Sequence, residues 1–204
     1  MAAASKSSVT PPDVDDSIES RILDAALVQF ESVGFKKTTV EDVARKAGVD
    51  RVTVYRRVGS RDDLVQAVVG REVQAVLTEL AELPERHDDA GDLVADMFVT
   101  VLTRWRDHRL AQRMLTLEPA RVIASLTTEG APAFTLSVAA AAAAVRRATE
   151  RGVLPEIPDA MTRMEVACRV VHSFILLPDI TVRFESDSEM AEFARTYLLP
   201  LVTG

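Results

Sequence analysis

The chain of 204 residues has a single cysteine, few aromatic side chains and no long uncharged apolar stretch. One cysteine, Cys168, excludes an internal disulfide bond, so the reducing cytoplasm is the expected compartment. The longest apolar run, residues 138–145, is mostly alanine and too short to cross a bilayer, so we expect no membrane contact. Residues 1–16 lack the apolar core of a secretory signal, and their small and polar residues predict a disordered arm.

The sequence also lacks the usual residues of an active site. It has no glycine-rich phosphate-binding loop. Its histidines, His87, His108 and His172, lie 21 and 64 residues apart, which is not a metal-ligand spacing. Cys168 lies in the apolar helical stretch VACRVV, where a thiol is usually inert packing. We therefore expect neither catalytic activity nor a cofactor nor a bound metal.

Charge is distributed unevenly along the chain, whose formal net charge is -7. Residues 36–61 contain eight Lys or Arg against three acidic residues, Glu41, Asp42 and Asp50, which gives a local charge of +5 and leaves -12 for the rest. A basic segment on an acidic body favours a local polyanionic partner. The alternative is an ordinary basic helix face in contact with solvent.

Apolar residues recur with helical spacing along the chain, and no segment shows the alternation of a β-strand. The pattern therefore predicts an all-α protein. In the N-terminal part, helices are expected at residues 17–33, 39–48, 51–58 and 60–83. Further along, long helices are expected at residues 91–108, 109–126 with a bend at Pro119, 132–151, 158–177 and 187–202. Thr39 with Asp42 and Ser60 with Asp63 have the spacing of capping boxes.

The helices expected at 39–48 and 51–58 are short and joined by a tight turn at Gly48, which is the plan of a helix-turn-helix. Asp50 is a good N-cap for the second helix. We expect an apolar seam between the two helices, formed by Val40, Val43, Ala44, Val49, Val54 and Val58. The opposite side of the second helix is then free, and it carries Arg51, Val52, Thr53, Tyr55, Arg56 and Arg57.

This free side suits the groove of a DNA duplex. Arginine can fork to guanine edges or pair with phosphate, Thr53 can form hydrogen bonds, and Tyr55 can reach a phosphate oxygen. Thr39 lies at a helix N-terminus, where its hydroxyl and the backbone N–H groups can hold a phosphate. Arg61 lies in the first turn of the next helix, where a cation opposes the helix dipole, and this favours an anion nearby.

The segments ILDAALVQFESVGFKKTTVEDVARKAGV, TVYRRV and SRDDL follow one another between Ile22 and Val69. In this order they resemble the N-terminal DNA-binding domain of the tetracycline-repressor (TetR) family. The resemblance implies that Thr39 caps the second helix and contacts the DNA backbone, and that Gly48 makes the turn. It also implies that Tyr55 binds a phosphate and that Arg61 is the basic residue at the start of the fourth helix.

Some positions depart from the residues that are frequent in that family, namely Asp50, Val52, Arg57, Val58 and Gly59. Asp50 still caps a helix but adds a negative charge near the groove, and Val52 replaces a commonly small residue. These departures leave the fold prediction unchanged. They do prevent the transfer of an operator sequence from other members.

After the arm at 1–16 that its composition predicts, the resemblance implies two domains: a helix-turn-helix DNA-binding domain at 17–66, and a helical effector-binding and dimerisation domain at 67–204. A long helix joins the two domains. The resemblance also implies a homodimer that reads a palindromic operator with two recognition helices about 34 Å apart. The predicted function is a sequence-specific transcriptional regulator, by the habit of the family a repressor, that a small effector releases from double-stranded DNA.

Candidate effector and dimer residues come from apolar stripes on the later helices. A hydrophobic effector is favoured by side chains that line an expected pocket: Met97, Phe98, Val101, Trp105, Met114 and Phe134. His108 and His172 are either polar anchors for the effector or structural residues. Two further stripes form the expected dimer surface: Met164, Cys168, Val171, Ile175, Met190, Phe193, Tyr197 and Leu201. For both sets the alternative is the ordinary core of the domain.

Two other functions stay open at this point. One is a helical DNA-binding architectural protein without a ligand, which the size and acidity of residues 67–204 disfavour, since they add core but no basic surface. The other is a helical interaction module with a vestigial helix-turn-helix. A preference for its own promoter over bulk DNA separates a specific regulator from an architectural protein. Replacing Tyr55 and Arg56 together with alanine tests the vestigial alternative, because only a working DNA reader loses affinity.

Overall fold

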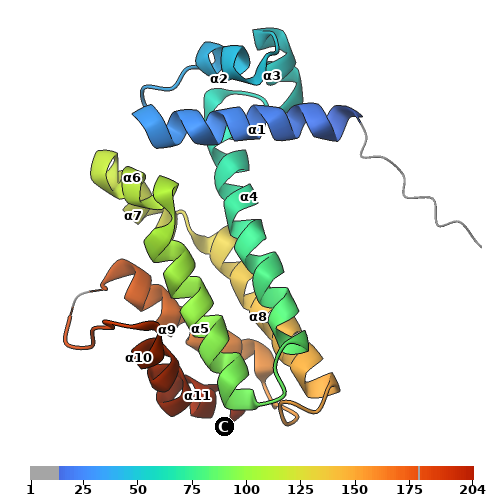
Figure 1. Ribbon diagram of the computed structural model, residues 1–204, viewed down its shortest axis with the longest axis vertical. Helices are drawn as coiled ribbons and strands as arrows, with labels where there is room; N and C mark the ends of the chain where they lie inside the picture. Colours follow the sequence, from blue (N-terminus) through green and yellow to red (C-terminus); the bar gives the residue numbers. More distant parts are fainter. Residues whose placement is uncertain (1–13, 179) are drawn as a thin grey trace, which may run out of the picture. The chain divides into compact units, whose positions relative to one another are not determined.

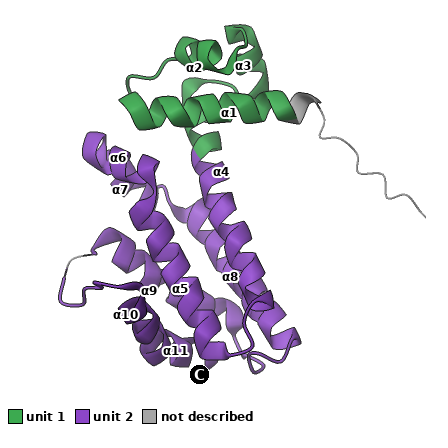
Figure 2. Cartoon of the chain, in the orientation of Figure 1, with its two compact units in different colours: residues 1–68 green, residues 69–204 purple. Residues whose placement is uncertain are grey.

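The computed structural model describes residues 14–178 and 180–204, and every regular element within them is helical (Figure 1). This confirms the predicted all-α fold. The chain divides into two compact units, unit 1 at Met1–Val68 and unit 2 at Val69–Gly204 (Figure 2). Most of the predicted N-terminal arm, residues 1–13, lies outside the described residues, and residues 14–16 belong to the first helix.

The described part of unit 1 consists of α1 (Val14–Val33), α2 (Val40–Ala47), α3 (Arg51–Arg57) and the first turns of α4 (Arg61–Glu82). Each of these helices contributes to the core, and Ile22, Val43, Val54 and Leu64 have no exposed surface. Phe30 of α1 and Phe35, which lies after that helix, are buried, and their rings meet edge to face with centroids 4.7 Å apart. Apart from this ring pair, small aliphatic side chains let the short helices α2 and α3 pack closely on α1.

Side-chain caps fix where the short helices begin. The Thr39 hydroxyl accepts a hydrogen bond from the Asp42 N–H at 3.1 Å, and the Asp42 carboxylate accepts one from the Thr39 N–H at 3.2 Å. At the start of α4, the Asp63 carboxylate accepts from the Ser60 N–H at 2.8 Å, and the Ser60 hydroxyl accepts from the Asp63 N–H at 3.3 Å. Both predicted capping boxes are present. Gly48 ends α2 with a φ of 66°, in the left-handed region that favours glycine.

Unit 2 continues α4 and adds a series of helices: η1 (Leu83–Glu85), α5 (Ala90–Asp107), α6 (Arg109–Leu117), α7 (Pro119–Leu126), α8 (Ala131–Glu150), α9 (Ala160–Leu176), α10 (Asp187–Phe193), η2 (Ala194–Leu198) and α11 (Leu199–Thr203). The bend predicted at Pro119 is a complete break between α6 and α7. Proline has no N–H to donate to the preceding turn, but it is well suited to the first position of a new helix. Glu118 lies between the two helices with φ of -140° and ψ of 54°.

The predicted last helix, 187–202, also differs in detail from the structure. It contains a π-helical turn, η2, between α10 and α11. Pro200 lies just after this turn. A proline inside an α-helix lacks a donor and collides with the carbonyl four residues earlier, here Thr196, so the widened turn relieves a conflict that the apolar pattern does not reveal.

Two apolar clusters form the core of unit 2. Cluster A has as its buried residues Leu83, Leu93, Val138, Ala142, Val145, Ala148, Leu154, Ile157, Met164 and Val202. Cluster B has Val94, Ala95, Phe98, Leu102, Met190, Ala194 and Leu198. In cluster B the Phe98 ring meets those of Phe174, Phe184 and Phe193, with centroids 5.8, 5.8 and 5.6 Å away. Helix α5 therefore packs on cluster A along one side and on cluster B along the adjacent side.

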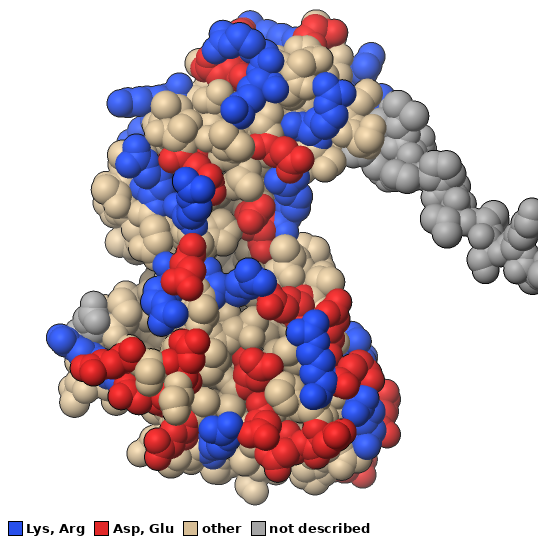
Figure 3. Space-filling view, viewed as in Figure 1, with Lys and Arg blue, Asp and Glu red and all other residues tan. Residues whose placement is uncertain are grey.

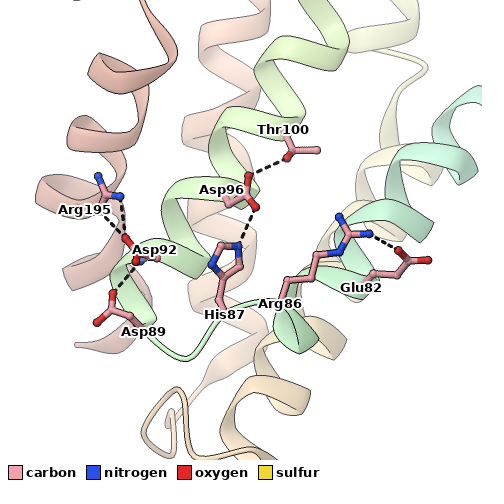
Figure 4. A network of polar contacts seen from close by, with 8 residues as sticks. All are labelled: Glu82, Arg86, His87, Asp89, Asp92, Asp96, Thr100 and Arg195. Atoms are coloured by element: carbon pink, nitrogen blue, oxygen red, sulfur yellow. Dashed lines mark hydrogen bonds and ion pairs between the residues drawn. The ribbon is translucent and has the colours of Figure 1, made fainter.

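Polar contacts attach the start of α5 to its neighbours (Figure 4). Asp92 accepts two hydrogen bonds from the guanidinium of Arg195 in η2, at 2.8 and 3.3 Å. His87, which precedes α5, has its Nε2 2.8 Å from a carboxylate oxygen of Asp96. Exposed pairs of this kind contribute little stability each. Of these contacts, the one between Asp92 and Arg195 joins α5 to η2.

Within residues 14–178 and 180–204, no single helix is long and apolar enough to span a membrane, and only α7 and α8 taken together, bent by 52°, have the length and composition of a span. The same part of the chain holds no group of three or more His, Cys, Asp or Glu side chains able to bind a metal ion.

Candidate nucleic-acid interface

Small aliphatic side chains hold α2 against α3. Val43 of α2 and Val54 of α3 are completely buried, and Ala44 is 4% exposed. Val49 and Val58, also predicted in this seam, are half-buried. Both helices contact α1 as well as each other. The arrangement is the predicted helix-turn-helix, in which one side of α3 meets the seam and the other side faces outward.

Asp50 fixes the start of α3. Its Oδ1 accepts a hydrogen bond from the Thr53 N–H at 2.6 Å. Hydrogen bonds from the Thr53 backbone and then its side chain lower the pKa of Asp50 below the usual 3.8. The carboxylate is therefore ionised at neutral pH, where its charge is favourable at a helix N-terminus. Asp50 departs from the residue usual in the family but performs the capping that was predicted for it.

The outward side of α3 brings four of the predicted DNA-contact residues together. Val52 is 71% exposed and Tyr55 is 43% exposed. Arg51 and Arg56 are also exposed, and the four positions share one side of the helix. Thr53 is half-buried, as is Arg57, so both contribute less to the outer surface than the sequence predicted.

Arg51 is held by two other side chains. Its Nη2 donates a hydrogen bond to the Tyr55 hydroxyl at 3.1 Å, and its guanidinium lies 5.2 Å from the centroid of the Tyr55 ring. Its Nη1 forms an ion pair with Glu41 of α2. The Tyr55 hydrogen bond and then the Glu41 charge raise the pKa of Arg51 above its usual value. Sequence reasoning missed Glu41, because its ten-residue separation from Arg51 crosses a turn and has no recognisable helical spacing.

Thr39 is exposed, as a phosphate contact requires, but its polar groups are already used. Its hydroxyl donates to the Asp42 carboxylate at 2.6 Å and accepts from the Asp42 N–H. The Thr39 side-chain and backbone hydrogen bonds lower the pKa of Asp42 below its usual value. A phosphate at this position therefore has to compete with an ionised carboxylate for the Thr39 hydroxyl.

Arg61 lies at the first residue of α4 and reaches back toward the loop between α1 and α2. One of its terminal nitrogens lies 3.5 Å from the Lys36 carbonyl oxygen, and the other lies 3.5 Å from the Asp62 carboxylate. Asp63, two residues on, caps the helix, and the Ser60 side chain and backbone lower the pKa of its carboxyl group. Arg61 is half-buried, and its side chain as a whole is 39% exposed.

Basic side chains are concentrated around these helices. Figure 3 shows one face of the molecule, on which Lys and Arg gather over unit 1 while acidic side chains are frequent over unit 2. The contributing segment is residues 36–61, with its eight Lys or Arg. The positive charge thus accompanies the outward side of α3 rather than the body of unit 2.

The predicted effector residues fall into different parts of unit 2. Met97 and Phe134 pack at the edge of cluster A, whereas Phe98 is buried in cluster B. Met114 is buried, and Val101 and Trp105 are half-buried. The six residues therefore do not all face one apolar cluster. Adjacent residues such as Met97 and Phe98 point in directions about 100° apart on a helix.

The two candidate histidine anchors have different surroundings. The Nε2 of His108 lies 3.1 Å from a Glu72 carboxylate oxygen, and its Nδ1 accepts a hydrogen bond from the Ala111 N–H at 3.3 Å. His172 of α9 lies beside Phe134 of α8, with ring centroids 5.6 Å apart. Its Nε2 is buried and has no hydrogen-bond partner among the described residues.

The predicted dimer residues are mostly turned inward. Met164 and Met190 are almost fully buried in clusters A and B, so they have little surface left for a partner. Cys168, Val171, Ile175, Phe193 and Leu201 are half-buried beside the same clusters. Tyr197 is 63% exposed. The stripes follow helical periodicity correctly, but most of their area packs within the chain.

Residues 22–68 match the family model described as bacterial regulatory proteins, tetR family. Over these residues the chain is similar to the N-terminal domain of the TetR family. The match runs from α1 to the first turns of α4 and includes all the predicted DNA-contact residues. It confirms the family resemblance that the sequence segments indicated.

Curated relatives and solved structures extend the comparison. The chain is 35% identical over 102 residues to an uncharacterized HTH-type transcriptional regulator of Mycobacterium bovis, covering 50% of this chain and 52% of that protein. It spans about half the length of the curated relatives it matches. Its fold is similar to that of the TetR family repressor AlkX from a Dietzia strain (TM-score 0.69, 21% identity, 90% and 94% of the two chains). A similar fold is found in SmeT, repressor of the Stenotrophomonas maltophilia efflux pump SmeDEF (TM-score 0.57, 21% identity, 92% and 91%).

Proposed function

We propose that this chain is a dimeric transcriptional repressor that binds a palindromic DNA operator and leaves it when a small hydrophobic effector binds. The observation that carries the proposal is the outward side of α3, where Arg51, Val52, Tyr55 and Arg56 are exposed on a helix-turn-helix. Their chemistry suits the major groove, because arginine reads guanine edges and tyrosine reaches phosphate oxygens. Val52 contributes an apolar contact, and Thr39, Thr53, Arg57 and Arg61 lie around this surface.

The proposed dimer uses the outward sides of α9 and the C-terminal helices. A single helix-turn-helix rarely binds one site specifically, whereas two copies one DNA turn apart read a palindrome. Val166 and Leu176 expose apolar surface on α9, at 42% and 36%, and Tyr197 does so at 63%. We infer that a second copy of the chain covers these exposed side chains, because reading a palindrome requires two copies.

The proposed effector contacts lie in unit 2 near Phe134. Its ring lies beside His172 and 5.3 Å from the guanidinium of Arg169. A buried imidazole nitrogen without a partner costs about 1–3 kcal/mol, and a polar group on a bound molecule would offset that cost. Met97, also at the edge of cluster A, adds apolar surface. A ligand with an apolar body and one polar end fits these residues.

Release from DNA follows if the effector binds one state of the dimer more tightly than the other. Helix α4 is one continuous helix whose first turns belong to unit 1 and whose remainder belongs to unit 2. It is therefore the covalent route between effector and operator. A small change in α4 alters the separation of the two α3 helices, and a separation that no longer matches successive major grooves ends operator binding.

The direct test of DNA binding uses the purified full-length protein and the genomic DNA upstream of its own gene. Fluorescence anisotropy at low salt is expected to show binding, and competition with random duplex is expected to show a preference of about 10³-fold or more. An architectural protein would show binding without that preference. Absence of binding to every tested double-stranded fragment would overturn the proposal.

The dimer is tested with Val166→Glu combined with Tyr197→Asp. The double variant is expected to be a folded monomer by light scattering and circular dichroism, with operator affinity lost. Leu136→Glu is the matched control, since Leu136 is an apolar side chain on α8 that is 47% exposed. A double variant that remains a dimer shows that the surface is elsewhere.

The effector is tested by titrating probe molecules against the operator complex. AlkX is described as implicated in n-alkane biodegradation, so long-chain alkanes, alcohols and carboxylic acids are suitable first probes. Binding by Trp105 fluorescence together with loss of operator anisotropy is the expected result. His172→Phe is expected to weaken a probe with a polar end and to leave the alkane unchanged. Probes that bind without moving the DNA equilibrium would exclude this coupling.

A further inference from the structure

Glu41 differs from the other acidic residues of the basic segment 36–61. Asp42 and Asp50 each cap a helix and have a local structural role. Glu41 lies in the first turn of α2, and its carboxylate forms an ion pair with Arg51 of α3. The same Arg51 guanidinium donates to the Tyr55 hydroxyl and lies over its ring. Glu41, Arg51 and Tyr55 thus form one connected group on the proposed DNA-binding surface.

We propose that Glu41 is a positioning and specificity-determining residue: it orients the Arg51 guanidinium against Tyr55 and withholds that charge from the phosphates of non-operator DNA. This inference rests on the proposed function. Glu41 itself does not bind a base or a phosphate, and it acts through Arg51.

The exposure of the pair makes this role possible. The Arg51 and Glu41 side chains are 57% and 52% exposed, so both charges remain hydrated and the pair is weak enough for a well-placed DNA group to compete with it. A phosphate that approaches Arg51 in an unfavourable geometry meets a neutralised pair rather than a lone cation. Non-specific binding depends almost entirely on phosphate charge, so Glu41 weakens it.

The orientation of Arg51 is the reason why Glu41 is expected to weaken binding to the operator less than binding to random DNA. A guanidinium has five N–H donors in a fixed planar fork, and here one terminal nitrogen faces Glu41 while the other faces the Tyr55 hydroxyl. The donors that remain have a defined direction before DNA arrives, which reduces the ordering cost of binding. A base edge in the matching position gains from this order, whereas a phosphate on an arbitrary duplex does not.

The experiment compares Glu41→Gln with the parent protein on operator and random duplexes over a range of salt concentrations. Glutamine keeps the size of the side chain and removes its charge. Random-duplex affinity at low salt is expected to rise about 2- to 5-fold. The plot of log affinity against log salt is expected to be steeper by about 0.9, because Arg51 now releases a counterion when it meets a phosphate. The operator-to-random ratio is expected to fall.

Two controls separate positioning from a general change in charge. Glu19→Gln removes the same charge from α1, at an exposed position of the same unit. Arg51→Gln combined with Glu41→Gln removes the group through which Glu41 acts. The change in slope is expected to be absent in Glu19→Gln, and Glu41→Gln is expected to have no further effect once Arg51 is gone. The inference is overturned if Glu19→Gln changes the slope as much as Glu41→Gln does. It is also overturned if Glu41→Gln changes the slope equally whether or not Arg51 has been replaced.

A readout without DNA distinguishes this inference from the proposed function. In the free protein, rotation of the Arg51 guanidinium, followed by nitrogen-15 magnetic resonance, is expected to be slow and to become faster in Glu41→Gln. Unchanged rotation overturns the positioning role even if DNA binding is intact. Failure of the parent protein to bind any duplex overturns the proposed function, while the rotation measurement still decides whether Glu41 orients Arg51.

Discussion

Units 1 and 2 use different side chains to hold helices together. Residues 1–68 contain ten Lys or Arg and eleven Asp or Glu, and they hold all four lysines of the chain, whereas residues 69–204 contain 14 arginines and 20 acidic residues. In unit 1, side-chain caps define where the short helices begin, and a core of mostly small aliphatic residues holds them together. Unit 2 packs longer helices on two apolar clusters, one of them rich in phenylalanine.

The difference explains why the sequence of unit 1 indicates its function more clearly than the sequence of unit 2 does. In unit 1 each cap and turn needs a particular residue type, and the family model matches residues 22–68, which contain those positions. In unit 2 many apolar residues can fill the same space, because cores tolerate substitution when volume and pattern are kept. Specific chemistry is therefore visible in unit 1, whereas unit 2 shows mainly a pattern of packing.

The strongest test of this comparison is Phe98→Ala in cluster B. Removal of a buried ring that meets three others is expected to lower the free energy of unfolding by about 3–5 kcal/mol. Trp105, the only tryptophan, lies in unit 2 and reports its unfolding in urea by fluorescence. Leu136→Ala at an exposed position is the control. A loss of similar size in the control would show that cluster B does not dominate the stability of unit 2.

The next effect concerns unit 1 alone. Tyr55→Ala combined with Arg56→Ala is expected to lower operator affinity about 10²- to 10³-fold, since two side chains proposed to contact DNA are removed at about 1–3 kcal/mol each. The oligomeric state and the unfolding of unit 2 are expected to be unchanged. Gln66→Ala, at an exposed position on α4, is the control for anisotropy measurements. Unchanged operator affinity in the double variant would contradict the assignment of the α3 surface.

A third prediction concerns the thiol in unit 2. Burial and then the nearby Glu165 charge raise the pKa of Cys168 from 9.0 to about 11. The neutral thiol is favoured in the folded protein, so at about pH 8 the thiolate fraction is about 100-fold lower than for an ordinary cysteine. Iodoacetamide is expected to react correspondingly slowly and to react faster in urea. Equal rates in folded and unfolded protein would contradict the burial of this group.

The smallest predicted effects are changes in stability on replacing two glycines. Gly48→Ala is expected to destabilise unit 1 by about 1–2 kcal/mol, because alanine is strained at a φ of 66°. Gly70→Ala is the matched control in α4, where an added methyl group meets nothing within 4 Å. It is expected to stabilise the helix by about 0.5–1 kcal/mol. Thermal unfolding followed by circular dichroism measures both changes, and the same sign for both would contradict this explanation.

Much of the fold could be predicted from periodicity and from terminal residues. The helices at 39–48 and 51–58 were expected within one residue of α2 and α3, because Thr39, Gly48 and Asp50 act locally on the backbone. The effects of Pro119 and Pro200 were harder to predict. Whether a proline bends, breaks or widens a helix depends on the packing around it, and the sequence pattern does not contain that information.

The candidate site could be predicted in part for the same reason. Spacing within α3 correctly places Arg51, Val52, Tyr55 and Arg56 on the outward side. The contact between Glu41 and Arg51 joins two helices, so it depends on how the turn folds. In unit 2 an apolar stripe looks the same whether it meets its own core or a second chain, which is why Met164 and Met190 were expected at the dimer surface.

The carboxylates at the helix starts of unit 1 make the proposed reading surface sensitive to acid. Hydrogen bonds hold the pKa values of Asp42, Asp50 and Asp63 below 3.8, so their contribution to stability is complete above that value and fades as the pH falls through the lowered values. Elution of this protein from an affinity resin with strong acid would therefore loosen the starts of α2, α3 and α4 together, and neutral elution preserves them.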